Sequence, residues 1–178
     1  MKRYSALFLG IIFVRVVWAA EIQVFFSPQG GCTDAVVSEL NQAKSNVLVQ
    51  AYSFTSAPIA KALVGAHRRG VKVTVILDKS QRTEQYSSAT FLRNQGVPTF
   101  IDDKHATAHN KVMVIDGRTV ITGSFNFTKR AEEKNAENLL VIRDIDLASR
   151  YRKNWDEHRA HSVAYHSSAN DNPTAPAR

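Results

Sequence analysis

The chain has 178 residues, a length that fits one domain with a buried core. Hydrophobic residues make up 44% and charged residues 22% of the sequence, as is ordinary for a soluble globular protein. Cys32 is the only cysteine, so an internal disulfide is excluded and burial of its thiol is expected. The formal net charge is +7, and it falls to +4 without Lys2, Arg3 and Arg15 at the N-terminus. A mildly basic domain tolerates nucleic acid or an anionic membrane surface without identifying either.

The first 20 residues resemble a secretory signal peptide. A basic start is followed by an apolar run over Leu7–Val17 and by the small residues Ala19 and Ala20. An uncleaved membrane anchor is the alternative, but the run is shorter than the roughly 20 apolar residues that span a bilayer, and Arg15 interrupts it. We therefore predict a cleaved signal over residues 1–20 and a periplasmic or secreted protein.

Strand and helix patterns alternate in the first half of the remaining chain. Apolar and β-branched runs predict strands over Glu21–Phe26, Val47–Phe54, Val71–Leu77 and Pro98–Ile101. Helices are predicted over Thr33–Ala43, from the N-cap Ser56 through His67 to a stop at Gly70, and from the polar stretch with Arg82 and Glu84 to near Gly96. This alternation predicts an α/β fold with a mixed, largely parallel sheet flanked by helices.

The pattern then changes to a hairpin. Two short apolar runs, separated by the turn signal Asp116-Gly117, predict strands over Lys111–Ile115 and Thr119–Thr122. A further strand is predicted over Leu139–Ile142 and a final helix over Asp146–Arg159. From position 166 onward no apolar residue is larger than Ala or Pro, so residues 166–178 are predicted to be a disordered tail. One domain is expected over residues 21–165.

The predicted hairpin brings polar side chains together at its open end. With a two-residue turn, Lys111 lies opposite Thr122 and His109 lies opposite Ser124. Strand alternation then places these four side chains on one face, and Asn126 follows if the strand continues. A bulge at the turn would shift the register by one residue and break this assignment.

These groups suit the chemistry of a phosphodiester. An imidazole serves as nucleophile or general acid/base near neutral pH, and a lysine supplies positive charge. Amide and hydroxyl groups donate hydrogen bonds to non-bridging oxygens, where charge must be held through the transition state. An edge hairpin that merely carries polar residues is the alternative. The apolar residues on both faces of the first strand favour burial instead, and a buried Lys and His rarely lack a function.

The spacing His109-x-Lys111-x-x-x-x-Asp116, followed after six residues by Gly123-Ser124-x-Asn126, resembles the HxKxxxxD…GSxN signature of the phospholipase D superfamily. Six residue types at fixed offsets are far more specific than a short motif. The resemblance extends from about position 22 to position 155. In size, N-terminal signal and single motif, the chain is similar to the small bacterial phospholipase D-like endonucleases, which implies a phospholipase D-like fold.

The resemblance also implies roles for the motif residues. His109 would attack phosphorus and form a phosphohistidine intermediate, while Lys111 and Asn126 would bind the non-bridging oxygens with help from Ser124. The aspartate of the family is mostly structural, so Asp116 is expected to stabilise the turn.

One acidic residue is also implied. Glu137 stands where this group of proteins places a carboxylate that orients the histidine, and such a carboxylate would fix the imidazole tautomer. Glu132 and Glu133 are nearby competitors for this role.

A single motif predicts assembly. Double displacement needs a nucleophile on one side of phosphorus and an acid for the leaving oxygen on the other, and one motif supplies one histidine. We therefore predict a homodimer with the active site at its two-fold axis. His105 is the alternative acid within the chain. His105 and His109 also suggest a zinc pair, but no third ligand is close to them in the sequence and neither lies on a clear helix, so no metal or other cofactor is expected.

Basic residues lie in loops near the predicted strand ends, where they could line a nucleic-acid groove: Lys79, Arg82, Lys104, Lys129 and Arg130. Phe54, Phe125 and Phe127 could stack on bases, although core packing is the commoner role of phenylalanine.

Three functions remain after these observations. The first is a nonspecific, metal-independent endonuclease acting on DNA or RNA, and the second is a phospholipase D or cardiolipin-type lipid hydrolase with the same catalytic residues. The third, a catalytically silent nucleic-acid-binding module, is disfavoured by the intact motif. The small domain, the basic loops and the lack of a long amphipathic membrane-binding segment favour the endonuclease.

Overall fold

The computed structural model describes residues 20–166. The predicted signal peptide, apart from Ala20, and the predicted tail, apart from His166, therefore lie outside the described residues. No helix within the described range is long and apolar enough to cross a membrane.

Eight strands and five α-helices make up the described part of the chain. The strands are β1 (Glu21–Ser27), β2 (Asn46–Ala51), β3 (Lys72–Asp78), β4 (Thr99–Asp102), β5 (Lys111–Ile115), β6 (Thr119–Gly123), β7 (Glu137–Arg143) and β8 (Val163–Ala164). The helices are α1 (Cys32–Gln42), α2 (Ala57–Arg68), α3 (Ala89–Asn94), α4 (Lys129–Glu133) and α5 (Ile145–His161). A short 3-10 turn over Lys79–Arg82 follows β3. The short elements α4 and β8 and the 3-10 turn were not predicted from the sequence.

All eight strands form one open sheet in the order β1-β7-β6-β5-β2-β3-β4-β8. This confirms a mixed α/β fold, but the expectation that most pairs are parallel is wrong. Of the seven strand pairs among the described residues, only β2–β3 and β3–β4 are parallel. Helices α2 and α3 make the crossovers that parallel pairing requires. In contrast, β5 joins β6 through a tight turn, β6 joins β7 through the segment that contains α4, and both pairs are antiparallel. Strand β1 pairs with β7 instead of β2.

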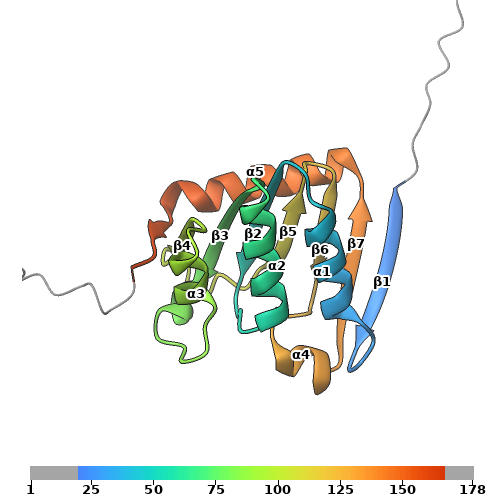
Figure 1. Cartoon of the computed structure of the whole chain (residues 1–178), viewed down its shortest axis with the longest axis horizontal. Helices are drawn as coiled ribbons and strands as arrows, with labels where there is room; N and C mark the ends of the chain where they lie inside the picture. The colour runs from blue at the N-terminus through green and yellow to red at the C-terminus, as the bar shows by residue number, and fades with distance from the viewer. Residues whose placement is uncertain (1–19, 167–178) are drawn as a thin grey trace, which may run out of the picture.

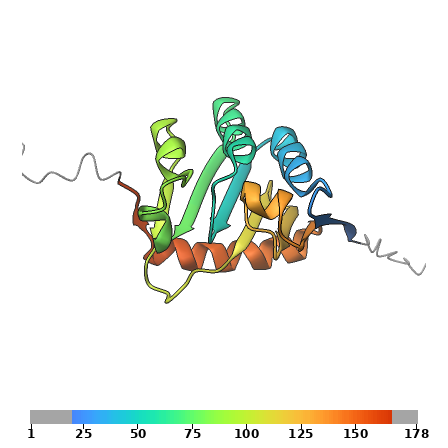
Figure 2. The ribbon, with the colours of Figure 1, turned by 90° about the horizontal axis from the view of Figure 1, so that it is seen from below.

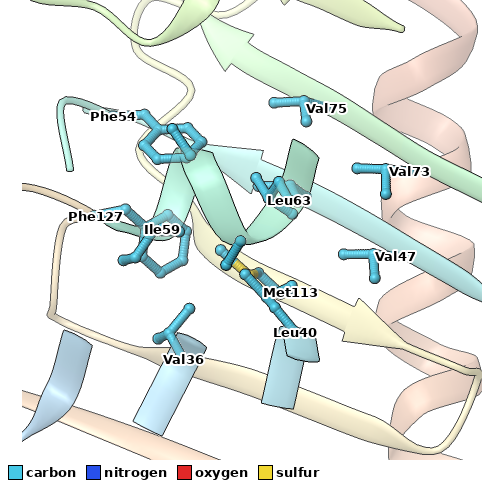
Figure 3. Packing of buried hydrophobic residues seen from close by; sticks show 14 of the residues in the cluster. Val36, Leu40, Val47, Phe54, Ile59, Leu63, Val73, Val75, Met113 and Phe127 are labelled. Carbon is cyan, nitrogen blue, oxygen red and sulfur yellow. The ribbon is translucent and has the colours of Figure 1, made fainter. Parts of the chain in front are cut away.

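The sheet lies between two helical layers. Helices α1, α2 and α3 cover one face and α5 runs across the other, from the β7 side of the sheet to the β4 side (Figures 1 and 2). The larger apolar core lies beneath α1 and α2, where Leu40, Ile59 and Leu63 pack on Met113 and the valines of β2 and β3 (Figure 3). Cys32 is fully buried in this core, as expected, and burial raises the pKa of its thiol to about 11.

The second, smaller core lies under α5. Trp155 packs there against Leu48 and Ile76, and its indole nitrogen donates a hydrogen bond to the carbonyl oxygen of Val49 at 2.9 Å. Asp144 caps the N-terminus of α5, and its carboxylate accepts a hydrogen bond from the backbone N–H of Leu147 at 2.8 Å. Ala148, Leu147 and Tyr151 of α5 belong to the same cluster as Trp155, so several turns of the helix pack on this face of the sheet.

Candidate active site

A cavity of about 410 Å³ opens at one end of the strands, where β6 ends and where β5 and β7 begin. The parallel strands β2 and β3 also end here, and the carboxyl ends of parallel strands are the usual position of a site in an α/β sheet. Every predicted site residue except Asp116 lines the cavity, together with one glycine: His109, Lys111, Gly123, Ser124, Asn126 and Glu137.

The register predicted for the hairpin is wrong by one residue. Ile115 pairs with Thr119 and Met113 pairs with Ile121, because the turn contains three residues instead of two. Asp116 and Gly117 both have positive φ, and Arg118 is the extra residue. Strand alternation therefore does not place Thr122 and Ser124 on the face that carries Lys111.

A second irregularity, at the end of β6, brings Ser124 to the cavity. The backbone N–H groups of Ser124 and Phe125 both donate to the carbonyl oxygen of Asn138, at 3.1 and 3.2 Å, which is a bulge opposite β7. Gly123 has φ +146, and a Cβ there would lie 2.3 Å from the same carbonyl oxygen. Only glycine fits this approach, which gives the glycine of the motif a physical reason.

The phenylalanines on either side of Asn126 fix its position. Phe125 and Phe127 are both fully buried, and the carbonyl oxygen of Phe127 accepts hydrogen bonds from the backbone of Thr55 and Ser56. Alternation along this segment turns Asn126 away from the core and into the cavity. These phenylalanines and Phe54, which is also fully buried, are thus core residues and do not stack on bases.

The imidazole of His109 packs against Tyr52, which directly follows β2. The centroids of the two rings lie 4.5 Å apart at an interplanar angle of 55°. Tyr52 also lies under Lys111, whose Nζ is 5.1 Å from the ring centroid. Tyr52 was not among the residues predicted from the sequence. Its place immediately after a buried strand, at the carboxyl end of a parallel pair, is the signal that could have found it.

Lys111 is a nearly buried cation, with 7% of its surface exposed. Its Nζ donates a 2.7 Å hydrogen bond to the carbonyl oxygen of His109. Burial lowers the pKa of Lys111 from its ordinary value, and the negative charge of Glu137 partly offsets this effect. The site therefore holds a cation that is little shielded by water and that faces the same cavity as the His109 ring.

Ser124 and Asn126 bring hydrogen-bonding groups to the cavity. The hydroxyl oxygen of Ser124 accepts hydrogen bonds from the backbone and side-chain nitrogens of Asn138, at 3.0 and 3.4 Å, so its own hydrogen is free to be donated. The amide oxygen of Asn126 is buried and has no hydrogen-bond partner within the described chain. This oxygen can only accept a hydrogen bond, so a phosphate oxygen in the cavity would be bound by the NH2 group of the same amide.

Of the three candidate glutamates, only Glu137 reaches the cavity. Glu132 instead accepts hydrogen bonds from the backbone N–H groups of Gly31 and Thr33 at the start of α1. Glu133 forms an exposed ion pair with Lys129. The carboxylate of Glu137 accepts a hydrogen bond from Asn135 at 3.0 Å, and its electrostatic partner is Lys111. The hydrogen bond that the orienting role requires, from the imidazole N–H of His109 to the carboxylate of Glu137, is not among the contacts of the described residues.

Asp116 lies at the turn of the hairpin, at the opposite end of the strands from the cavity. Its carboxylate accepts hydrogen bonds from the backbone N–H groups of Lys44, Ser45 and Asn46, at 2.7 to 3.0 Å, and from the Ser45 hydroxyl at 2.9 Å. These bonds tie the hairpin to the segment between α1 and β2. Burial alone would raise the pKa of Asp116, but the backbone hydrogen bonds outweigh it and lower the pKa.

Asp116→Asn is expected to lower the free energy of unfolding by about 1–2 kcal/mol at neutral pH, because charge-assisted hydrogen bonds are replaced by weaker ones. Asparagine tolerates the positive φ at this position, so backbone strain does not add to the effect. The wild-type carboxylate has its full stabilising effect above the ordinary pKa of 3.8 and loses it as the pH falls through the lower folded-state pKa. Urea unfolding between neutral and acidic pH measures this difference, with Glu157→Gln as an exposed control. Equal stability of Asp116→Asn and wild type would contradict the structural role.

The remaining candidate residues lie outside the cavity. His105 contacts Asp102, His158 and His161 instead of His109. Among the basic residues, Lys79 donates to the carbonyl oxygen of His105, and Arg82 pairs with Asp103 at 3.5 Å. These two side chains, like Lys104, Lys129 and Arg130, are exposed at the edge of the sheet that carries the cavity.

Comparisons with known proteins agree with this geometry. The profile of the family described as "Cardiolipin synthase, PLD-like domain" matches residues 36–159. The structure of Nuc from Salmonella typhimurium, described as a phospholipase D family member, is 39% identical and superimposes with a TM-score of 0.80 over 84% of this chain and 100% of Nuc. NucT from Helicobacter pylori, at 24% identity and a TM-score of 0.76 over 83% of this chain and all of NucT, shares the fold.

Curated relatives carry two different names. "Phospholipase D" of Rickettsia felis is 39% identical over 141 residues, which cover 79% of this chain and 70% of the relative. "Mitochondrial cardiolipin hydrolase" of Xenopus laevis is 32% identical over 160 residues, covering 76% of each. The fold and the cavity thus define a phosphodiesterase of the phospholipase D type. The chain belongs to the phospholipase D superfamily.

Proposed function

We propose that this protein is an exported, metal-independent endonuclease that cleaves DNA, and also accepts RNA, without sequence specificity. The observation that carries the proposal is the cavity in which an imidazole, a buried ammonium, an amide and a hydroxyl meet. His109 attacks phosphorus and displaces one ester oxygen, which leaves with a proton from an acid on the opposite side. Water then attacks the phosphohistidine, and the P–N bond breaks to return the free imidazole.

Fixed positive charge replaces a metal ion in this scheme. Negative charge on the non-bridging oxygens is met by Lys111 and by hydrogen bonds from Asn126 and Ser124. Because Lys111 is nearly buried, its attraction for a phosphate is weakened less by water than that of a surface lysine.

The surface around the cavity favours a polyanionic substrate. Five basic residues lie exposed along the same edge of the sheet. Tyr86 and Phe91, which are 73% and 41% exposed, lie between β3 and β4 and contribute flat aromatic surface beside Lys61. Positive charge with exposed aromatic rings suits single-stranded nucleic acid, whose bases stack on such rings.

A phospholipid is the second candidate substrate, because the curated relatives are named for phospholipase D and cardiolipin hydrolase activity. The same four groups would bind the phosphodiester of a lipid headgroup. The choice between the substrates therefore depends on surfaces beyond the cavity.

One experiment tests both the chemistry and the substrate. We expect purified protein in EDTA to nick plasmid DNA and to leave phosphatidylcholine and cardiolipin vesicles intact, because no step in the proposed chemistry needs a metal. Circular dichroism recorded in the same buffer checks that the fold is retained. Lipid turnover without DNA cleavage would replace the endonuclease by the lipid hydrolase. Loss of all activity in a folded, chelated sample, restored by a divalent ion, would overturn the metal-independent mechanism.

We further propose that the active enzyme is a homodimer with one reaction centre at its two-fold axis. The cavity contains one histidine, His109, whereas double displacement needs an acid on the other side of phosphorus. A second copy related by two-fold symmetry would supply it. The competing acid, His105, is held in contact with Asp102 and points its Nδ1 at that carboxylate, which weakens its case.

Mixing experiments test this assembly. Wild-type and His109→Ala chains are mixed at wild-type fraction f, unfolded and refolded so that they pair at random. A shared centre makes activity fall as f squared, to about one quarter at equal mixing, whereas independent sites retain about one half. A linear dependence on f, or a fully active monomer in sedimentation, would place the acid within the chain.

Export follows from the N-terminal sequence and is part of the proposal. N-terminal sequencing of protein recovered from the periplasm and the medium is expected to begin close to Ala20. Recovery of full-length chains in the membrane fraction would favour the anchored alternative.

A further inference from the structure

Four side chains meet at the end of β4, outside the cavity around His109. The carboxylate of Asp102 is completely buried, and three imidazole nitrogens surround it. Nδ1 of His158 is 2.6 Å from Oδ2, Nδ1 of His105 is 3.1 Å from both oxygens, and Nε2 of His161 is 3.2 Å from Oδ1. One nitrogen or oxygen atom of each residue lies within 4.8 Å of those of the others.

Hydrogen bonding alone does not account for this cluster. Nε2 of His161 is buried and, despite its 3.2 Å separation from Asp102, has no hydrogen-bond partner in the described chain. A buried ring nitrogen without a hydrogen bond is unfavourable, and this one lies within 4.8 Å of three other ligand-type atoms. A cation at the centre of the cluster would satisfy this nitrogen and neutralise the buried carboxylate.

The donor set indicates the kind of cation. Imidazole nitrogens bind zinc and similar transition ions, whereas magnesium and calcium prefer oxygen ligands. A tetrahedral zinc ion with bonds of about 2.0–2.1 Å holds its ligand atoms about 3.3 Å apart. The separations from Asp102 are 2.6 to 3.2 Å and all four ligand atoms lie within 4.8 Å of one another, so small side-chain movements would bring them to this spacing. Oδ1 of Asp102 also accepts a hydrogen bond from the backbone N–H of Lys104, a typical outer contact of a ligating carboxylate.

The local structure presents these ligands together. His158 and His161 are three residues apart in the last turn of α5, so both lie on one face of the helix. Asp102 ends β4, and His105 follows in the loop that leads to His109. The partners of His105 were not predicted from the sequence, because His158 and His161 lie more than 50 residues further along the chain. Their H-x-x-H spacing is the signal that could have found them.

We propose that Asp102, His105, His158 and His161 form a structural binding site for one zinc ion or a similar divalent transition-metal ion. Four protein ligands close the coordination sphere, as in structural rather than catalytic zinc sites. The site lies across three strand spacings from Lys111, along the row β5-β2-β3-β4, which is about 14 Å. The ion therefore takes no part in the reaction at His109.

The bound ion would add a connection between two parts of the fold. It would link the end of α5 to the end of β4, where Arg159 already stacks on Phe100 and β8 pairs with β4. It would also fix the start of the loop between β4 and β5, whose other end is held by a 2.7 Å hydrogen bond from the N–H of Ala108 to Asp78. The hydrogen bond from Ala108 to Asp78 separates this part of the loop from His109, so removal of the ion is expected to leave the position of His109 unchanged.

Metal analysis tests the site directly. Protein purified without chelator is expected to contain about one equivalent of zinc per chain by plasma mass spectrometry. After chelation and dialysis, the folded protein is titrated with Co²⁺, whose visible absorption reports four-coordinate binding. His161→Asn should weaken Co²⁺ binding at least about tenfold, and His67→Asn, a histidine in α2 outside the cluster, should not. Zinc should raise the unfolding temperature of wild type and of His67→Asn but not of His161→Asn.

Two results would overturn the site. Folded wild-type protein that neither retains zinc nor binds Co²⁺ would reduce the cluster to a hydrogen-bonded His–Asp network. Equal Co²⁺ affinity of wild type and His161→Asn would place the ion elsewhere, and His105→Asn, in an exposed loop, replaces His161→Asn if that variant does not fold. These measurements need no substrate, so they stand apart from the proposed endonuclease activity.

Discussion

His109→Asn is expected to lower DNA cleavage by at least about four orders of magnitude, because removal of a covalent nucleophile leaves only binding and charge stabilisation. The fold should survive, since the side chain is exposed in the cavity and its main packing contact is the ring of Tyr52. Asparagine is polar and similar in size, but it cannot form the phosphorus–nitrogen bond. Initial rates on plasmid DNA, with unfolding curves of the same samples, measure the two effects separately.

His67→Asn is the matched control, because it makes the same substitution on α2, away from the cavity, and should leave the rate unchanged. A radiolabelled oligonucleotide quenched during turnover should leave label on wild-type protein, released by acid as expected for a phosphorus–nitrogen bond. Peptide mapping should place that label on His109. Label on Ser124, or rates of His109→Asn within tenfold of wild type, would mean that another group is the nucleophile.

The alternation of strands and helices was predictable, whereas the directions of the strands were not. Runs such as VKVTVIL over 71–77 need two covered faces, and this requirement reveals both the strand and its flanking helices. Strand β1 pairs with β7, which lies more than 100 residues further along the chain. No local sequence pattern indicates such a long-range pairing partner. The short α4 and β8 carry too few residues for any period to be visible.

The residues that line the cavity were predicted from the sequence, but the backbone geometry that brings them together was not. Alternation from a two-residue turn would have put Ser124 beside His109, and the three-residue turn breaks that register. The bulge opposite Asn138 then brings Ser124 to the cavity by a different route. Two local irregularities thus produce the grouping that a regular hairpin was expected to produce. The bulge depends on the carbonyl oxygen of Asn138 and on Gly123, so the alternation of apolar and polar residues along the strand cannot reveal it.

Lys111→Met is expected to have the second largest effect, a loss of about two to three orders of magnitude in kcat/KM, because the cation that holds the phosphate through the transition state is gone. Stability should change little. The variant gives up a desolvated charge, which favours folding, and it also loses the 2.7 Å hydrogen bond to the carbonyl oxygen of His109, which opposes it. Lys129→Met, at a 79% exposed lysine side chain, is the control and should lower cleavage only slightly.

The pH dependence of kcat/KM gives a further test, because it reports ionisations of the free enzyme. Lys111 binds phosphate only while protonated, and burial lowers its pKa from the ordinary 10.5. Activity should therefore begin to fall, as the pH rises, at a lower pH than an ordinary lysine would give. In Lys111→Arg the cation persists at every accessible pH, so the remaining activity should lack this alkaline fall, although the larger guanidinium lowers the rate itself. The same alkaline fall in wild type and Lys111→Arg would assign it to another group and would remove Lys111 as the phosphate-binding cation.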